Sequence, residues 1–240
     1  MKAIYLFTEL EKGILHTIKA ADIYTIHLVA IQRNEQPNQQ LIQDIIINEK
    51  ISGLTIFSMS YRKEEKEKLE EKGYLINIGN QIILAIYTAL EFYLTNKFKE
   101  YFQYRLKGVN TINGEKTLEK LSFRSLDNIK DLYKDILGIY LPQFEMREIL
   151  VDEHSLFKPE SSWDGIKTIE KARHEIAHEG KTKAYKTTIL PDVWHPFNFV
   201  RRWVTLFDVN FDLFIYEGRA TQLIREYQKR VESLPNKKTH

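Results

Sequence analysis

The sequence predicts an all-α protein. Its 240 residues include only 10 Gly and 6 Pro, which is few turn-forming residues for a fold of many short strands. Apolar residues instead recur at intervals of three and four over long stretches, a spacing that places them on one face of a helix. With 43% hydrophobic and 28% charged residues, the chain can bury a sizeable core beneath a charged surface. We therefore expect a helical bundle.

The first helix is predicted over residues 1–33. Its apolar stripe consists of Leu6, Leu10, Ile14, Ile18 and Ala21. A polar segment around Pro37 ends it, and residues 41–60 fit either a buried helix or short strands. The mixed-charge run 62–72 is typical of a solvated helix face with i,i+4 ion pairs. We interpret residues 1–75 as a mainly helical N-terminal extension.

The most regular apolar stripe predicts a helix over residues 80–106. The positions of this stripe are Ile83, Tyr87, Leu90, Leu94, Phe98 and Tyr101. A further helix is predicted over residues 117–137. It should end at Gly138, because glycine readily adopts the left-handed conformation that terminates helices.

The next helix is predicted from a capping pattern. Ser161 and Asp164 have the spacing of two residues that satisfy the free N–H groups at a helix start. The helix should run from there to about Glu179, with Gly180 as its stop.

The C-terminal part of the chain predicts a turn and two more helices. Pro191 and Pro196 bracket the turn, and a strongly apolar stripe predicts a helix over residues 197–217. We interpret residues 76–220 as the helical bundle and residues 221–240 as a basic C-terminal helix and tail.

Residues 171–180 contain a motif with two chemically different interpretations. They read Lys-Ala-Arg-His-Glu-Ile-Ala-His-Glu-Gly, in a chain with seven His and no Cys. His174, Glu175 and His178 match HExxH, in which the two His bind zinc and the Glu acts as a base. That site needs a third ligand, and lysine and alanine stand where a metzincin has glycine and a third histidine. This departure weakens the zinc interpretation.

The second interpretation begins from Arg173 and gives an RxxxxH pattern ending at His178. On an ideal helix, Arg173 falls within the predicted buried face, and His174 and His178 lie together on its flank. The residues of that face are Ile166, Ile169, Ile176 and Ala177. A permanent charge on an apolar face needs an acidic partner such as Glu170, free carbonyl groups or an anion. The arrangement favours an anion such as phosphate over zinc.

This motif resembles that of the HEPN family of nucleotide-binding helical bundles. Arg173, the polar His174 and the final His178 match the three motif positions, and a small apolar pair precedes the last His. The aromatic-rich segment 89–98 is similar to the first helix of a HEPN domain. The resemblance covers residues 76–217, and the Glu-Gly pair that follows the last His departs from the family pattern.

The resemblance implies a metal-independent endoribonuclease that leaves a 2′,3′-cyclic phosphate and a 5′-OH. His178 would transfer protons, Arg173 would neutralise the phosphate, and His174 would either share the proton transfer or orient the phosphate. The family joins two motifs across a two-fold interface, so a homodimer with a composite site is expected. The resemblance also implies a toxin or effector of prokaryotic defence, with a cognate antitoxin or regulatory protein as partner and no cofactor.

Basic and aromatic residues near the motif are candidate RNA contacts. They are Lys97, Arg105, Lys181, Lys183 and Tyr185. The net charge of +2 and the pI near 8.5 are only mildly basic, so RNA binding would depend on a local patch. No stretch has the length and apolarity of a membrane span or a signal peptide, and the absence of Cys is compatible with a reducing cytosol. We expect a cytoplasmic protein.

Three functions remain open on the sequence. The favoured one is the endoribonuclease. The second is a non-catalytic HEPN module that uses the same groove to bind a nucleotide or a protein. The third is a zinc metallopeptidase that uses His174, Glu175 and His178.

Overall fold

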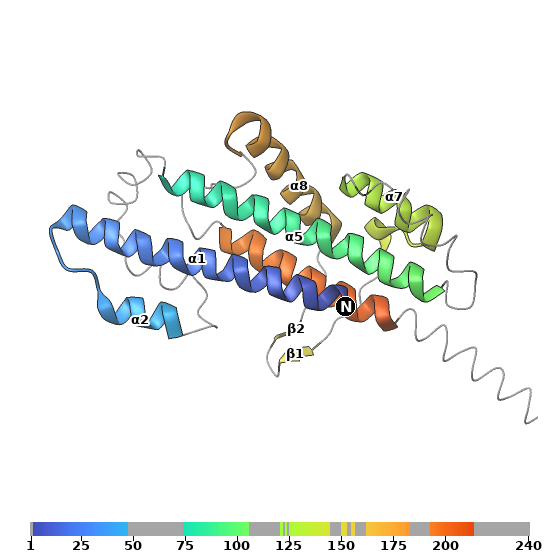
Figure 1. The fold of residues 1–240 in the computed structure, drawn as a ribbon, viewed down its shortest axis with the longest axis horizontal. Coiled ribbons are helices and arrows are strands. Elements are labelled where there is room, and N and C mark those ends of the chain that lie inside the picture. The colour runs from blue at the N-terminus through green and yellow to red at the C-terminus, as the bar shows by residue number, and fades with distance from the viewer. Residues whose placement is uncertain are drawn as a thin grey trace, which may run out of the picture. The chain divides into compact units, whose positions relative to one another are not determined.

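A computed structural model describes residues 2–47, 74–105, 121, 123, 125–144, 150–152, 155–156, 162–182 and 193–213 (Figure 1). The helices are α1 (Ala3–Arg33), α2 (Gln39–Ile47), α5 (Tyr74–Arg105), α7 (Leu126–Leu137), the 3-10 helix η1 (Leu141–Gln143), α8 (Ser162–Glu179) and a helix over residues 193–213. One short antiparallel pair, β1 (Leu150–Asp152) and β2 (Ser155–Leu156), accompanies them. The predicted all-α class is confirmed.

The chain divides into two compact units. Helices α1, α2, α5, α7 and α8 belong to the first unit, together with η1 and helical residues 193–204. The strand pair and helical residues 205–213 belong to the second unit, where the rings of Phe207 and Phe211 lie 5.4 Å apart. The candidate site lies in the first unit. No helix in the described segments is long and apolar enough to cross a membrane.

Helices α1 and α5, the two longest elements, pack along each other in antiparallel orientation (Figure 1). At one end, the backbone N–H of Ala3 donates to Glu100 Oε2 at 3.0 Å. One turn further along α1, the ring of Phe7 meets the ring of Tyr93 edge-on at 5.7 Å. The predicted N-terminal extension therefore contributes its first helix to the same compact unit as the predicted bundle.

The buried stripe of α1 differs slightly from its prediction. Ile14, Ile18 and Ala21 are buried as expected, but Leu10 is 39% exposed. Phe7 is buried instead, because it lies seven residues before Ile14 on the same helix face and its ring meets Tyr93 of α5. In contrast, every position of the predicted α5 stripe is buried.

Helix α2 resolves part of the ambiguity in the N-terminal region. Residues 39–47 are helical rather than extended. Ile42 and Ile45 pack with Ile26 of α1 in a small apolar cluster, which is why the segment folds back as a helix. The charged run 62–72 lies outside the described residues.

Three helix starts differ from the sequence-based prediction. Helix α5 begins at Tyr74, six residues before the predicted start at Asn80. Helix α7 begins only after Ser125, whose hydroxyl accepts from the Asn128 N–H at 3.2 Å, so the predicted start at residue 117 is wrong. The last helix already includes Pro196, so the predicted turn there is wrong as well.

Two predicted helix ends are confirmed. Gly138 ends α7 with φ +70°, and Gly180 follows α8 with φ +71°. Ser161, the predicted cap of α8, and the predicted tail 221–240 lie outside the described residues.

Candidate functional site

The motif lies on the C-terminal half of α8, which packs against α5 (Figure 1). The buried positions of α8 are Ile166, Ile169, Ala172 and Ile176. At the base of the helix, Gly165 allows the Phe199 ring to approach so closely that a Cβ would lie 2.2 Å from it. At the other end, Asn80 Nδ2 of α5 donates to the Gly180 carbonyl at 2.7 Å. Both ends of the motif helix are thus fixed to neighbouring elements.

Arg173 is exposed, which corrects the prediction that it lies within the buried face. Helix α8 crosses α5 at an angle (Figure 1), and the buried residues of its C-terminal half lie on one side of the helix. Ala172 and Ile176 occupy the covered side, while Arg173 and Ala177 face solvent. The long side chain keeps its charge in water in this position, and burial would have been costly.

The Arg173 guanidinium lies over the ring of Tyr87, with 5.4 Å between its central carbon and the ring centroid. This is a cation–π contact, worth about 0.5–1 kcal/mol at an exposed site. Arg173 makes no hydrogen bond or ion pair within the described residues. Its expected partner Glu170 pairs with Lys167 instead, so the alternative of an Arg173–Glu170 pair is wrong. The donor groups of the guanidinium are therefore available to an anion.

His174 and His178 stand together on the exposed side of α8. Their ring centroids are 4.3 Å apart and the ring planes are inclined by 51°. Both residues are solvent-exposed, and neither donates to another described side chain. The structure thus brings Arg173 and the two imidazoles onto the same end of one helix.

Glu175, the general base of the zinc interpretation, is held away from this pair. Its Oε2 accepts from the Thr182 hydroxyl at 2.6 Å, and its Oε1 lies 3.9 Å from Lys171 Nζ. Within the residues that the structure describes, no group of three His, Cys, Asp or Glu side chains is arranged to hold a metal ion. A third zinc ligand is not found in that part of the chain.

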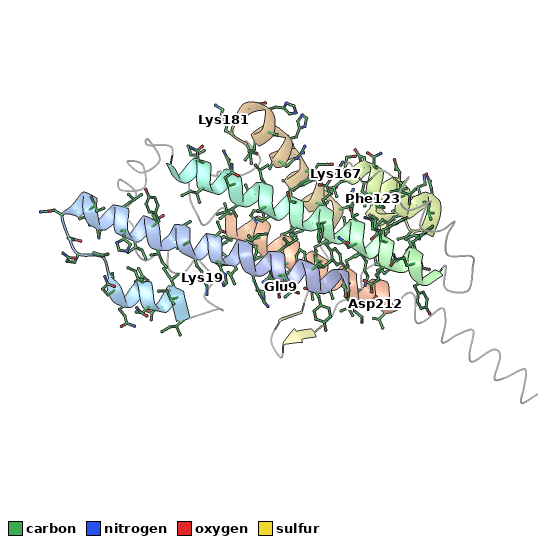
Figure 2. The ribbon with its side chains drawn as sticks, in the orientation of Figure 1. Glu9, Lys19, Phe123, Lys167, Lys181 and Asp212 are labelled. Atoms are coloured by element: carbon green, nitrogen blue, oxygen red, sulfur yellow. The ribbon has the colours of Figure 1, made fainter. Side chains whose placement is uncertain are left out.

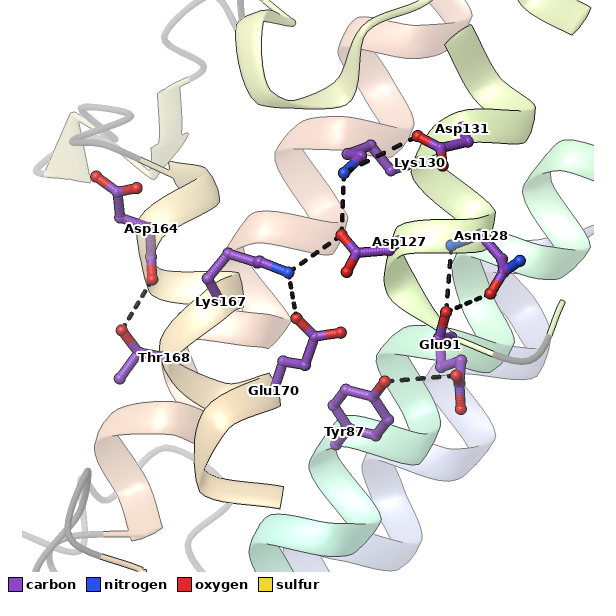
Figure 3. Close-up of polar contacts among 11 residues, drawn as sticks. Tyr87, Glu91, Asp127, Asn128, Lys130, Asp131, Asp164, Lys167, Thr168 and Glu170 are labelled. Atoms are coloured by element: carbon purple, nitrogen blue, oxygen red, sulfur yellow. Dashed lines mark hydrogen bonds and ion pairs between the residues drawn. The ribbon is translucent and has the colours of Figure 1, made fainter. Parts of the chain in front are cut away.

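Below the motif, charges of alternating sign join α8 to α7 (Figure 3). Lys167 of α8 lies between Glu170 on its own helix and Asp127 of α7, whose Oδ1 is 3.2 Å away. Lys130 donates to the same Asp127 oxygen at 2.9 Å. The hydrogen bonds from Lys130 and Lys167 lower the pKa of the Asp127 carboxyl. These exposed pairs link the two helices and occupy the acidic groups nearest the base of the motif.

Helix α5 contributes Tyr87 and Glu91 to the same region (Figure 3). The Tyr87 hydroxyl donates a long hydrogen bond to Glu91 Oε1, at 3.4 Å. Burial raises the pKa of the Glu91 carboxyl, while Arg173 and the Tyr87 hydroxyl offset part of that rise. Burial also raises the pKa of Tyr87 above its ordinary value, so the phenol keeps its proton at neutral pH.

The candidate RNA contacts have different outcomes. Lys97 is only 4% exposed, so it cannot contact RNA, and its selection from the sequence is wrong because position 97 lies on the buried side of α5. Lys181 is exposed just past the end of α8 (Figure 2). Arg105 is the last residue of α5, with its side chain outside the described atoms. Lys183 and Tyr185 lie outside the described residues.

Tyr87 and Glu91 are the site residues that the sequence interpretation missed. Tyr87 was assigned only to the apolar stripe of α5, and Glu91 was assigned no role. Their i,i+4 spacing shows that they can meet on one helix face, but their proximity to Arg173 depends on the pairing of α5 with α8.

No family model, curated protein or solved structure matches this chain. The HEPN resemblance therefore remains a hypothesis that rests on the motif and on its place in a helical bundle.

Proposed function

We propose that this protein is a metal-independent endoribonuclease of the HEPN type. The observation that supports this most is the arrangement on α8, where two adjacent exposed imidazoles stand beside an arginine without an ion-pair partner among the described residues. The set combines two groups for proton transfer with a permanent cation for a phosphate.

RNA supplies its own nucleophile, which is why this set is sufficient. A base removes the proton of the 2′-OH, and the oxygen attacks the adjacent phosphorus. The P–O bond to the 5′ oxygen breaks, and an acid protonates that oxygen as it leaves. The products are a 2′,3′-cyclic phosphate and a 5′-OH.

His174 and His178 would divide the base and acid roles between them, since an imidazole can either accept or donate a proton. Arg173 would stabilise the negative charge that builds on the phosphorane. Removal of one such preorganised charge typically lowers kcat by about 10²–10³-fold. Lys181, exposed two residues beyond the helix end, would contact the RNA backbone.

The proposal includes a homodimer, in which the motifs of two chains form one composite site across a two-fold axis. It also places the protein in the cytoplasm as a toxin or effector of prokaryotic defence, controlled by a cognate antitoxin or regulatory protein. Sedimentation of the purified protein tests the dimer directly, and a monomer at micromolar concentration would contradict it.

Cleavage of total RNA by the purified protein tests the activity. We expect wild type to cleave in EDTA, and Arg173→Ala and His178→Ala to lose about 10²-fold or more in rate. His16→Ala is the matched control, because His16 is an exposed histidine on α1, outside the motif. Product 3′ ends that resist ligation after phosphatase treatment alone, and become ligatable when acid opens the cyclic phosphate before the phosphatase removes the resulting monophosphate, would establish the chemistry.

The same assay separates the other functions. Loss of cleavage in EDTA would replace the metal-free mechanism with a metal-dependent one. RNA binding without cleavage, weakened by Arg173→Ala, would indicate the non-catalytic module. Intact and equally bound RNA with all variants would refute the ribonuclease proposal.

A further inference from the structure

We propose that Tyr87 and Glu91 are positioning residues for Arg173. The Tyr87 ring supports the guanidinium, and the Tyr87 hydroxyl keeps the Glu91 carboxylate from capturing it, so that Arg173 stays available for a phosphate. This inference rests on the proposed function, because it assigns Arg173 to phosphate binding.

The support from the ring follows from its burial. Tyr87 is 4% exposed and belongs to the buried stripe of α5, so its ring cannot move far without disturbing the core. The guanidinium lies 5.4 Å from the ring centroid. A guanidinium held over an aromatic ring keeps its N–H groups directed outward, around the edge of the guanidinium plane. The ring attracts the positive charge but does not accept hydrogen bonds from these groups as a carboxylate would.

The Tyr87 hydroxyl acts on the Glu91 carboxylate. Glu91 lies one turn from Tyr87 on α5 and is close enough to Arg173 for the two charges to interact. Glu91 nevertheless makes no ion pair with Arg173, and its carboxylate accepts from the Tyr87 hydroxyl instead. The buried phenol remains a donor at neutral pH, which maintains this contact.

The second carboxylate near this region has its own partner. Glu170 is one turn below Arg173 on α8 and pairs with Lys167, which also contacts Asp127 (Figure 3). Glu91 and Glu170 therefore both have other contacts. In the described part of this network, Arg173 is the cation that is left without an ion pair. An arginine already paired with a carboxylate would have to exchange that partner for each phosphate that binds.

The mechanism predicts a specific pattern of loss and rescue. Tyr87→Phe keeps the ring and removes the hydroxyl, so Glu91 becomes free to pair with Arg173 and to compete with phosphate. Glu91→Gln in the same chain removes the competing charge and restores binding. A purely structural role of the hydroxyl gives no such rescue, because the second substitution does not replace the lost contact.

Two measurements test this on the full-length protein. The first is the Kd for a 2′-O-methyl RNA oligonucleotide, which cannot be cleaved. Tyr87→Phe should raise this Kd by about two- to fivefold, the range expected for a partly exposed ion pair, and the double variant should return to within a factor of about 1.5 of wild type. Tyr133→Phe is the matched control, because it also removes a buried tyrosine hydroxyl, one that donates to the Leu94 carbonyl.

The second measurement is the NMR signal of the Arg173 Nε–H group without any RNA. Tyr87→Phe should shift this signal and slow its exchange with water, as in an ion pair, and the double variant should reverse both changes. An Arg173 signal that is unchanged in Tyr87→Phe would overturn the inference, as would a Kd that the second substitution does not restore. If the signals behave as expected but wild type leaves RNA intact, the proposed ribonuclease function fails while the positioning of Arg173 by α5 stands.

Discussion

The buried carboxyl of Asp22 predicts a specific dependence of stability on pH. Asp22 lies on α1 and is 3% exposed, and its Oδ1 has no hydrogen-bond partner among the described residues. Burial raises its pKa from 3.8 to about 7, and the nearby Trp194 indole offsets part of the rise without reaching hydrogen-bond geometry. The folded state therefore binds a proton at pH values where the unfolded chain has already released it.

The sign and size of the effect follow from this difference. Between about pH 4 and pH 7 the native carboxyl is protonated and the unfolded one is ionised, so the free energy of unfolding falls as the pH rises. The pKa values of Asp22 in the folded and unfolded states differ by about 3, and each pKa unit corresponds to about 1.4 kcal/mol in the free energy of unfolding. Asp22 should thus cost about 4 kcal/mol of stability at pH 8 relative to pH 4. Above pH 7 its contribution is constant.

Asp22→Asn removes the charge with little change in shape. Urea denaturation at pH 4 and at pH 8 should show a variant whose advantage over wild type grows by about 4 kcal/mol between the two. The exposed Asp135→Asn, on α7, is the control and should show almost no such growth. A constant difference between Asp22→Asn and wild type across this range would refute the reasoning, because it would mean that the carboxyl is already ionised in the native state.

Four further substitutions test side-chain packing and a helix cap, each by urea denaturation. Gly165→Ala should destabilise by about 1–3 kcal/mol, because its Cβ would lie 2.2 Å from the Phe199 ring. Gly13→Ala is also within a helix, but its Cβ would meet no described atom within 4 Å apart from its chain neighbours and its own helix backbone, so it should stabilise by about 0.5–1 kcal/mol. Equal effects of the two substitutions would contradict the close approach at Gly165. Tyr133→Phe should cost about 1 kcal/mol, since its buried hydroxyl donates to α5 at 2.8 Å. Ser125→Ala should cost about 1 kcal/mol through the lost cap of α7, and an unchanged midpoint would show that water replaces the cap.

The helices could be predicted wherever apolar spacing is regular. All positions of the α5 stripe are buried, because residues at this spacing lie on one face along the whole length of the helix, and that face is turned toward the core. The start of α7 was missed because apolar Leu121 continues the period, although residues 121 and 123 are not helical. Ser125 was the better signal for the start of α7, because a serine that caps a helix stands directly before its first helical residue.

The pairing of helices could not be predicted, because a stripe shows which face is buried and not what buries it. Residues 1–75 were therefore assigned to an extension, although α1 is the helix that lies along α5. The same limit explains the site. The His174–His178 contact follows from spacing on one helix, whereas the exposure of Arg173 depends on the crossing of α8 and α5. The burial of Lys97 likewise depends on how α5 is surrounded.

The antiparallel pairing of α1 with α5 has a consequence for the order of folding in the cell. The N-terminal contact joins Ala3 to Glu100, 97 positions apart in the chain. At about 5–20 residues per second, the ribosome takes about 5–20 s to make the partner of this end of α1. The entropy of closing so long a loop is modest, since each doubling of length adds only about 0.6 kcal/mol. The waiting time matters more, because until α5 emerges the growing chain exposes an apolar helix face that a chaperone can bind.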